Sequence, residues 1–159
     1  SDSVDTINAD EDTIQDIDSA NYSRYYNLRY AYRVDFPKKL LTAQPEADNG
    51  DGRVFTDNKG NVILTVYGSS VDYLSTVYKS MVDSTQSKQN KITYDSSGVV
   101  SGFKGEAVFY YKRIFTNRGI VAIMLEYPKV DSVKYKTVVN AVSRSLRKIK
   151  VEEEGGGKE

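Results

Sequence analysis

The sequence predicts an α+β fold, in which a mainly antiparallel sheet of five to seven strands is packed by two main helices, at about residues 71–87 and 131–148. Three observations lead to this fold class. Several stretches alternate apolar and polar residues with a period of two, as half-buried strands do, and two others repeat apolar residues at helical spacing. Short turn sequences separate consecutive strands, which indicates hairpins rather than parallel crossovers.

Size and composition exclude several classes of protein. The 159 residues suit one domain with a single core. The 22 basic and 22 acidic residues cancel, which argues against a nucleic-acid-binding protein. The absence of His and Cys rules out Ser-His-Asp catalysis, His-ligated metals and disulfides. No run of about 18 apolar residues occurs, so no transmembrane segment is expected, and no sequence motif indicates a cofactor.

The composition divides the chain into three parts. Residues 1–21 contain seven acidic side chains and no Lys or Arg, which predicts a disordered acidic leader, either a tether or an interaction arm. Residues 22–150 form the single globular domain. Residues 151–159 include three consecutive glycines and are expected to be a flexible tail.

The first ordered stretch, residues 22–36, has its apolar residues at alternate positions. It is either one long strand or a tight hairpin that turns near residues 29–31, and we favour the hairpin. Pro37 is expected to end it, because proline cannot donate to a ladder. Residues 38–47 read as irregular, with a short helical turn at 39–42.

The centre of the chain is a turn cluster followed by a hairpin. Residues 48–52 are rich in turn formers, and the strand pair that follows turns at 57–61. Ser69 and Asp72 then have the spacing of a capping box at the start of the helix at 71–87. The apolar stripe of this helix is Val71, Leu74, Val77, Tyr78, Met81 and Val82.

The second half of the domain begins with short extended pieces at 92–94 and 99–103, followed by strands at 106–115 and 119–127. Residues 120–125 are continuously apolar, which indicates a central strand covered on both faces. Helices are therefore expected on both faces, or a helix on one face and loops on the other. Asp131 is the expected N-cap of the last helix. Its apolar stripe comprises Tyr135, Val138, Val139, Val142, Leu146 and Ile149.

Candidate chemistry is sparse. Glu106 and Glu126 lie on neighbouring predicted strands and are the only plausible carboxylate pair for a hydrolase. Asp48, Asn49 and Asp51 have the oxygen ligands that hard cations prefer, but their spacing does not match an EF-hand loop. Residues 101–104 match the S-x-x-K pattern of serine β-lactamases, without the helix or the companion motifs.

Thirteen tyrosines against five phenylalanines suit a surface that contacts protein or carbohydrate, although strands also favour tyrosine. The contact of the basic face of the last helix with anionic lipid, or with the acidic leader, is a second hypothesis. The residues expected to contact a ligand or partner are Tyr25, Tyr30, Asp48, Asn49, Asp51, Arg53 and Glu126.

Seven short stretches together resemble a group of uncharacterised exported bacterial proteins and the Mog1/PsbP-like α/β/α sandwich. They are residues 32–37, 49–55, 66–69, 101–102, 109–112, 125–128 and 142–146. The resemblance implies that a non-catalytic binding or assembly role is more common for this fold than catalysis. It also implies export to the periplasm or cell surface, with a lipid anchor on a preceding Cys that this sequence does not contain.

The leading hypothesis is therefore a non-enzymatic binding or assembly domain of the bacterial cell envelope. Its expected partner is another envelope protein or a glycan, with no nucleic acid, metal or cofactor. A hydrolase that uses Glu106 and Glu126 is one alternative, and a carrier of a small molecule or cation is the other.

Overall fold

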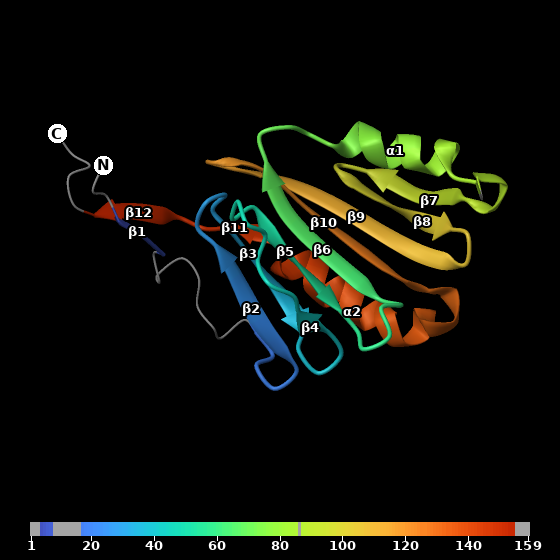
Figure 1. The fold of residues 1–159 in the computed structure, drawn as a ribbon, viewed down its shortest axis with the longest axis horizontal. Helices are drawn as coiled ribbons and strands as arrows, with labels where there is room; N and C mark the ends of the chain where they lie inside the picture. Colours follow the sequence, from blue (N-terminus) through green and yellow to red (C-terminus); the bar gives the residue numbers. More distant parts are fainter. Residues whose placement is uncertain (1–3, 8–16, 86, 155–159) are drawn as a thin grey trace.

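The computed structural model describes residues 4–7, 17–85 and 87–154, and its main element is a seven-stranded antiparallel sheet (Figure 1). The order across this sheet is β4-β5-β6-β10-β9-β8-β7. In chain order its strands are β4 (Thr42–Ala43), β5 (Gly52–Thr56), β6 (Ile63–Ser69), β7 (Lys91–Ser96), β8 (Val99–Lys104), β9 (Ala107–Thr116) and β10 (Gly119–Pro128).

A second, three-stranded sheet has the order β11-β3-β2. It consists of β2 (Tyr22–Asn27), β3 (Tyr32–Pro37) and β11 (Arg147–Lys148). Tyr22 pairs with Pro37 and Asn27 with Tyr32, so residues 22–37 form the hairpin and not one long strand. The prediction of a hairpin and of a strand ending at Pro37 is thus confirmed, but the hairpin belongs to a separate sheet.

The two faces of the large sheet are covered by different elements. One face packs against α2 (Ser132–Ser145) and the small sheet, around the buried side chains of Leu64, Val66, Ile123 and Leu125. The other face packs against α1 (Leu74–Asp83), which covers the part of the sheet around Val100, Phe109, Tyr111 and Ala122. Both faces of β10 are therefore covered, as its apolar sequence predicts. The predicted α+β sandwich is confirmed, and of the two arrangements expected for its faces the one with helices on both is present.

Both helices are shorter than predicted. α1 begins at Leu74, and its N-cap position is Tyr73, with no side-chain cap. The expected capping box is wrong, because Ser69 and Asp72 instead accept hydrogen bonds from the amides of Val71 and Leu74, each two residues later. Val71 and Val82 are exposed and lie outside the core. The helix is followed by a short 3₁₀ turn, η3 (Ser87–Gln89).

The last helix ends at Ser145 rather than near residue 148. Leu146 and Ile149 are buried as predicted, but the backbone there is extended and forms β11. The start also differs, because Asp131 occupies the N-cap position without a side-chain cap. A 3₁₀ turn, η4 (Lys129–Asp131), precedes the helix, and the Ser132 hydroxyl donates to the carbonyl of Lys129 at 2.6 Å.

Two segments expected to be flexible contain strands. β1 (Val4–Ile7) pairs with β12 (Val151–Glu154), so that Val4 lies opposite Glu154. Figure 1 shows this pair at one end of the molecule, away from the start of α2. The rest of the predicted leader up to residue 16, and residues 155–159, lie outside the described residues, and the expected domain limits stay a prediction. Residues 38–47 contain the predicted turn, in which the amides of Leu40 and Leu41 both bind the Pro37 carbonyl, and also the short strand β4.

Candidate functional site

The strongest candidate site is a groove between β3 and α2, where the small sheet lies beside the helix. Two hydrogen bonds join these elements at the C-terminal end of α2. The amide of Asp35 donates to Ser145 Oγ at 2.8 Å, and Arg33 Nη1 donates to the Ser145 carbonyl at 3.2 Å. β3 pairs with β11 only at Tyr32 and Arg33. Beyond this pairing, the outer edge of β3 is hydrogen-bonded to the helix instead of to another strand.

The groove is half open and has a volume of about 800 Å³. One wall is the face of α2 that presents residues three or four positions apart, as helical geometry requires. The other wall is the β2–β3 hairpin, and the turn after β3 closes one end. The ionisable residues that line it are Asp18, Tyr22, Arg33, Asp35, Lys39, Lys134, Arg144 and Arg147.

The charge of the groove is strongly unbalanced towards cations. Five basic side chains line it against two carboxylates. One of the carboxylates, Asp35, is already paired with Arg24, whose Nε and Nη2 donate to it at 2.6 and 3.1 Å. This pair is buried, with exposed fractions of 5% for Arg24 and 8% for Asp35. Asp18 accepts a hydrogen bond from Asn21 Nδ2 at 2.9 Å. The groove therefore has the electrostatic character of an anion-binding site.

The cations are spread along the groove rather than gathered at one point. Lys134 and Arg144 lie on the same side of α2, and a rise of about 1.5 Å per residue places them about 15 Å apart along the axis. Between them the wall is mainly apolar, with Val138 and Ala141 beside Thr137 on the helix and Leu40 opposite. A single small anion cannot contact both ends, whereas an extended chain of about four or five residues has this length.

The pKa of Tyr22, which lines the groove, is displaced. Burial raises the pKa of its hydroxyl above the ordinary value, and the negative charges of Asp18 and Asp35 act in the same direction. The positive charge of Arg144 opposes them. The phenol is thus a neutral donor at pH 7, available to a ligand oxygen.

The predicted contact residues lie elsewhere, around the loop before β5. Tyr25 is buried, its hydroxyl donates to Glu46 Oε2 at 2.5 Å, and burial raises its pKa to about 12. Asn27 Nδ2 donates to Tyr25 Oη at 3.0 Å and to the Gly50 carbonyl at 2.8 Å. The Tyr32 hydroxyl donates to the Asp51 carbonyl at 3.0 Å. These contacts fix the loop on the hairpin.

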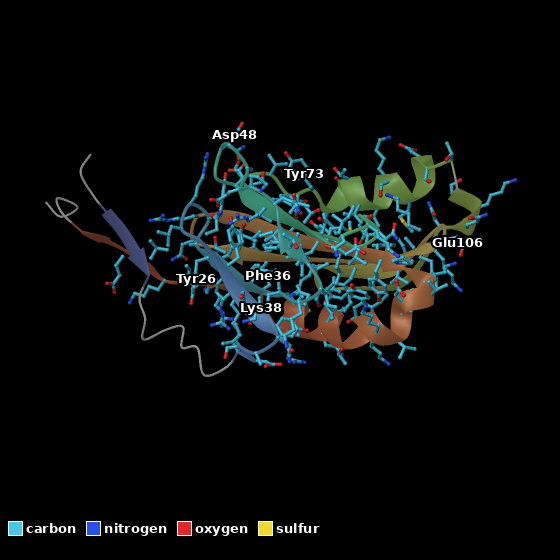
Figure 2. All side chains as sticks on the ribbon, turned by 60° about the horizontal axis from the view of Figure 1, so that its bottom comes forward. Tyr26, Phe36, Lys38, Asp48, Tyr73 and Glu106 are labelled. Atoms are coloured by element: carbon cyan, nitrogen blue, oxygen red, sulfur yellow. The ribbon has the colours of Figure 1, made fainter. Side chains whose placement is uncertain are left out.

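Arg29 holds the same loop from outside, through a hydrogen bond to the Asn49 carbonyl and an ion pair with Asp51 at 3.5 Å. Asp48 is exposed, and Figure 2 shows it far from Glu106. In the described part of the chain, no group of three or more acidic side chains could hold a metal ion. The contact role expected for Asp48, Asn49 and Asp51 stays a prediction.

The remaining predicted contacts are also packed within the domain. Arg53 Nε donates to the Gln44 carbonyl at 2.5 Å. Tyr30 lies against Gly68 and Gly119, where an added Cβ would come within 2.3 and 2.8 Å of its ring atoms. Both side chains thus have structural contacts that account for them, and their role in partner contact stays a prediction.

The candidate carboxylates lie at different places on the sheet. Glu126 is half-buried on β10 and pairs in register with Phe109. The neighbours Leu125 and Tyr127 belong to the core under α2, so alternation places Glu126 on the opposite face. Glu106 lies in the exposed turn before β9, where its carbonyl accepts the Lys129 amide. Three positions of strand, about 10 Å, separate Glu106 from the residue opposite Glu126.

The basic residues of α2 are evident in the sequence, but no sequence pattern predicts that Arg33 and Lys39 lie in the same groove. Their juxtaposition depends on the docking of β3 against α2, which joins residues more than 100 positions apart. No local pattern reports this contact. The sequence gives only a weak indication of the buried ion pair between Arg24 and Asp35. Both are charged residues within strands whose side chains alternate between polar and apolar.

No helix in the described part of the chain is both long and apolar enough to cross a membrane. No protein-family model matches the sequence, and no curated protein matches it. The fold is similar to the solution structure of cyanobacterial PsbP (CyanoP) from Synechocystis sp. PCC 6803, with a TM-score of 0.55. The identity is 14%, and the match covers 81% of this chain and 93% of that one. At this identity the likeness concerns the fold alone: the chain has a PsbP-like α+β sandwich.

Proposed function

We propose that this chain is a non-enzymatic binding domain of the bacterial cell envelope, and that the groove between β3 and α2 holds an acidic segment of another envelope protein. The observation that carries the proposal is the groove itself, with five basic side chains against two carboxylates, one of which is neutralised by Arg24. The envelope location rests on the resemblance of the sequence to exported bacterial proteins.

The form of the groove favours a peptide over a small anion. Cations lie at both ends of a wall about 15 Å long, and an apolar stretch separates them. A segment of four or five residues with an acidic side chain near each end, and an aliphatic one between, satisfies all three regions. Because the edge of β3 is already bonded to Ser145, recognition depends on side chains rather than on addition of a strand.

The test compares two neighbouring cations. Arg147 lines the groove, whereas Lys148 does not, although both are exposed residues of β11. Successive strand residues point to opposite sides, so Lys148→Glu is a matched control for Arg147→Glu. Binding of an acidic peptide of this design is measured by calorimetry, with the Asn/Gln version of the same peptide as a second control.

We expect Arg147→Glu, alone or with Arg144→Glu, to weaken peptide binding about tenfold or more, while Lys148→Glu has little effect. Binding should also weaken as salt rises, because exposed charges are screened. Equal losses of affinity for Arg147→Glu and Lys148→Glu would mean that the peptide is held by non-specific charge attraction. That result would refute the groove as its binding site. Glu126→Gln should leave binding unchanged, because Glu126 lies on the other face of the sheet. An enzymatic activity lost in that variant would favour the hydrolase instead.

A further inference from the structure

A second surface, which shares only Lys134 with the groove wall, lies at the end of the molecule where α2 begins. Val130 in η4 and Val133 in the first turn of α2 have exposed fractions of 90% and 92%. No other exposed large hydrophobic side chain of the described residues exceeds 73%. Two nearly free aliphatic side chains three residues apart lie on one side of a helical turn. Scattered apolar residues are normal on surfaces, so the neighbours decide what this pair means.

Lysines from several elements lie at the same end of the molecule as the two valines. Hydrogen bonds connect these elements at the same end of the sheet. The Lys129 amide binds the Glu106 carbonyl, the Gly105 amide binds Asn90 Oδ1 at 3.0 Å, and Asn90 Nδ2 binds the Met81 carbonyl at 2.9 Å. Figure 1 shows η3, the turn between β8 and β9, and the start of α2 together at this end. The lysine-rich end consists of Lys88, Lys91, Lys104, Lys129, Lys134 and Lys136, with Val130 and Val133.

The lysine-rich end is basic even after its acidic residues are considered. Glu106 and Asp131 belong to the same region, and Asp83 is already paired with Lys79 at 2.7 Å. Two of the amines lie over aromatic rings, Lys129 Nζ at 4.8 Å from the Phe103 ring and Lys134 Nζ at 5.7 Å from the Tyr135 ring. Stacking of this kind places the charge at the surface without burying it.

The support beneath the valines is rigid. Tyr135 is buried, with an exposed fraction of 3%, and stacks on Tyr127 of β10 at a centroid distance of 5.3 Å. The turn that carries Val130 and Val133 is therefore fixed on the sheet. A fixed apolar pair surrounded by amines matches the interface of an anionic bilayer, where valines enter the acyl boundary and lysines contact phosphates.

We propose that the lysine-rich end docks the protein peripherally on a membrane surface that contains anionic phospholipid. The charge complementarity of the lysines selects the lipid headgroups, and the two valines supply the shallow insertion. A folded acidic protein would also complement the charge of the lysines. Its binding would not require two almost fully exposed valines. The lysine-rich end shares only Lys134 with the proposed peptide groove, and docking through it orients that end of the groove towards the lipid.

The experiment is sedimentation of the full chain with vesicles of phosphatidylcholine, with and without phosphatidylglycerol. The double variant Val130→Asp/Val133→Asp should lower partitioning onto the anionic vesicles about tenfold, because it places charge where the apolar contact forms. Val133→Phe should raise partitioning. The single variants Val130→Asp and Val133→Asp should each lower partitioning in part, and their matched control is Val71→Asp, which adds the same single charge at a side chain that is 51% exposed near the other end of the sheet.

Several results would overturn the proposal. They are no sedimentation with anionic vesicles at low salt, equal losses in Val71→Asp and in the double variant, or binding that depends on salt but not on the valines. Thermal melts of each variant separate loss of docking from loss of fold. Arg147→Glu should keep at least half of the vesicle binding, which distinguishes failure of docking from failure of the groove.

Discussion

The amide of Asp35 donates a hydrogen bond to the hydroxyl of Ser145 at 2.8 Å, and this hydroxyl donates in turn to the Val142 carbonyl at 2.8 Å. One buried serine thus joins the small sheet to the end of α2 and forms the base of the groove. The relationship explains why the helix ends at this residue: the chain turns there to place β11 beside β3.

Ser145→Ala should destabilise the domain by about 1–3 kcal/mol, because the buried Asp35 amide loses its acceptor. Urea unfolding measures the change. Ser75→Ala, at an exposed position of α1, is the control and should change the free energy of unfolding by less than about 0.5 kcal/mol. If the two variants were equally stable, the bond would not be a significant link between the layers.

Asp35→Asn tests the buried ion pair beneath the groove. Asparagine carries no charge to offset the buried Arg24 guanidinium, whose Nε now lies 2.6 Å from the Asp35 carboxylate, and the expected loss of stability is about 3–5 kcal/mol. The contrasting pair is Lys79 with Asp83, exposed on α1 with a spacing of four residues. Asp83→Asn should cost less than about 1 kcal/mol. Similar losses for both variants, measured by urea unfolding, would contradict the burial of the Arg24 pair.

The helices and strands of the domain could be predicted from the sequence much better than the residues at which the helices end. Leu146 and Ile149 continue the helical spacing from Val142, and both are buried, so periodicity alone extends the helix past Ser145. The actual end is set by a tertiary contact, the pairing of Arg147 and Lys148 with β3. Propensity and spacing do not report such a contact, because it depends on residues more than 100 positions away.

The candidate site was only half visible for the same reason. The cations of α2 stand out in the sequence, but the groove also needs Arg33 and Lys39 from the opposite wall. Tyr25 and Asp51, by contrast, are predicted contact residues because of their residue types. In the structure they belong to an internal hydrogen-bond network that holds the loop before β5. Residue type indicated polarity there, and only the fold distinguishes a polar contact inside the domain from one available to a partner.

The stability of the domain should fall in alkali because of Tyr25. Burial and the bond to Glu46 raise its pKa from 10 to about 12, so the folded state favours the protonated phenol. This contribution is fully present below pH 10 and is lost as the pH rises from about 10 to 12. Urea unfolding as a function of pH measures it, and Tyr25→Phe should show a shallower decline over this range. A parallel decline in both proteins would assign the effect to the other buried tyrosines.

The packing of Tyr30 on Gly68 gives the last prediction. An added Cβ at Gly68 would lie 2.3–2.6 Å from Cβ, Cγ and Cδ2 of Tyr30, the inner atoms of the side chain, which cannot move aside without the backbone. Gly68→Ala should therefore cost about 1–3 kcal/mol, as overpacking does. Tyr30→Gly removes all three of these atoms, so the two changes should couple: Gly68→Ala should cost much less in the Tyr30→Gly background. A double-mutant cycle by urea unfolding measures this coupling energy. A coupling energy near zero would mean that Tyr30 does not pack firmly on Gly68. It would then favour the predicted role of Tyr30 in contacting a ligand or partner.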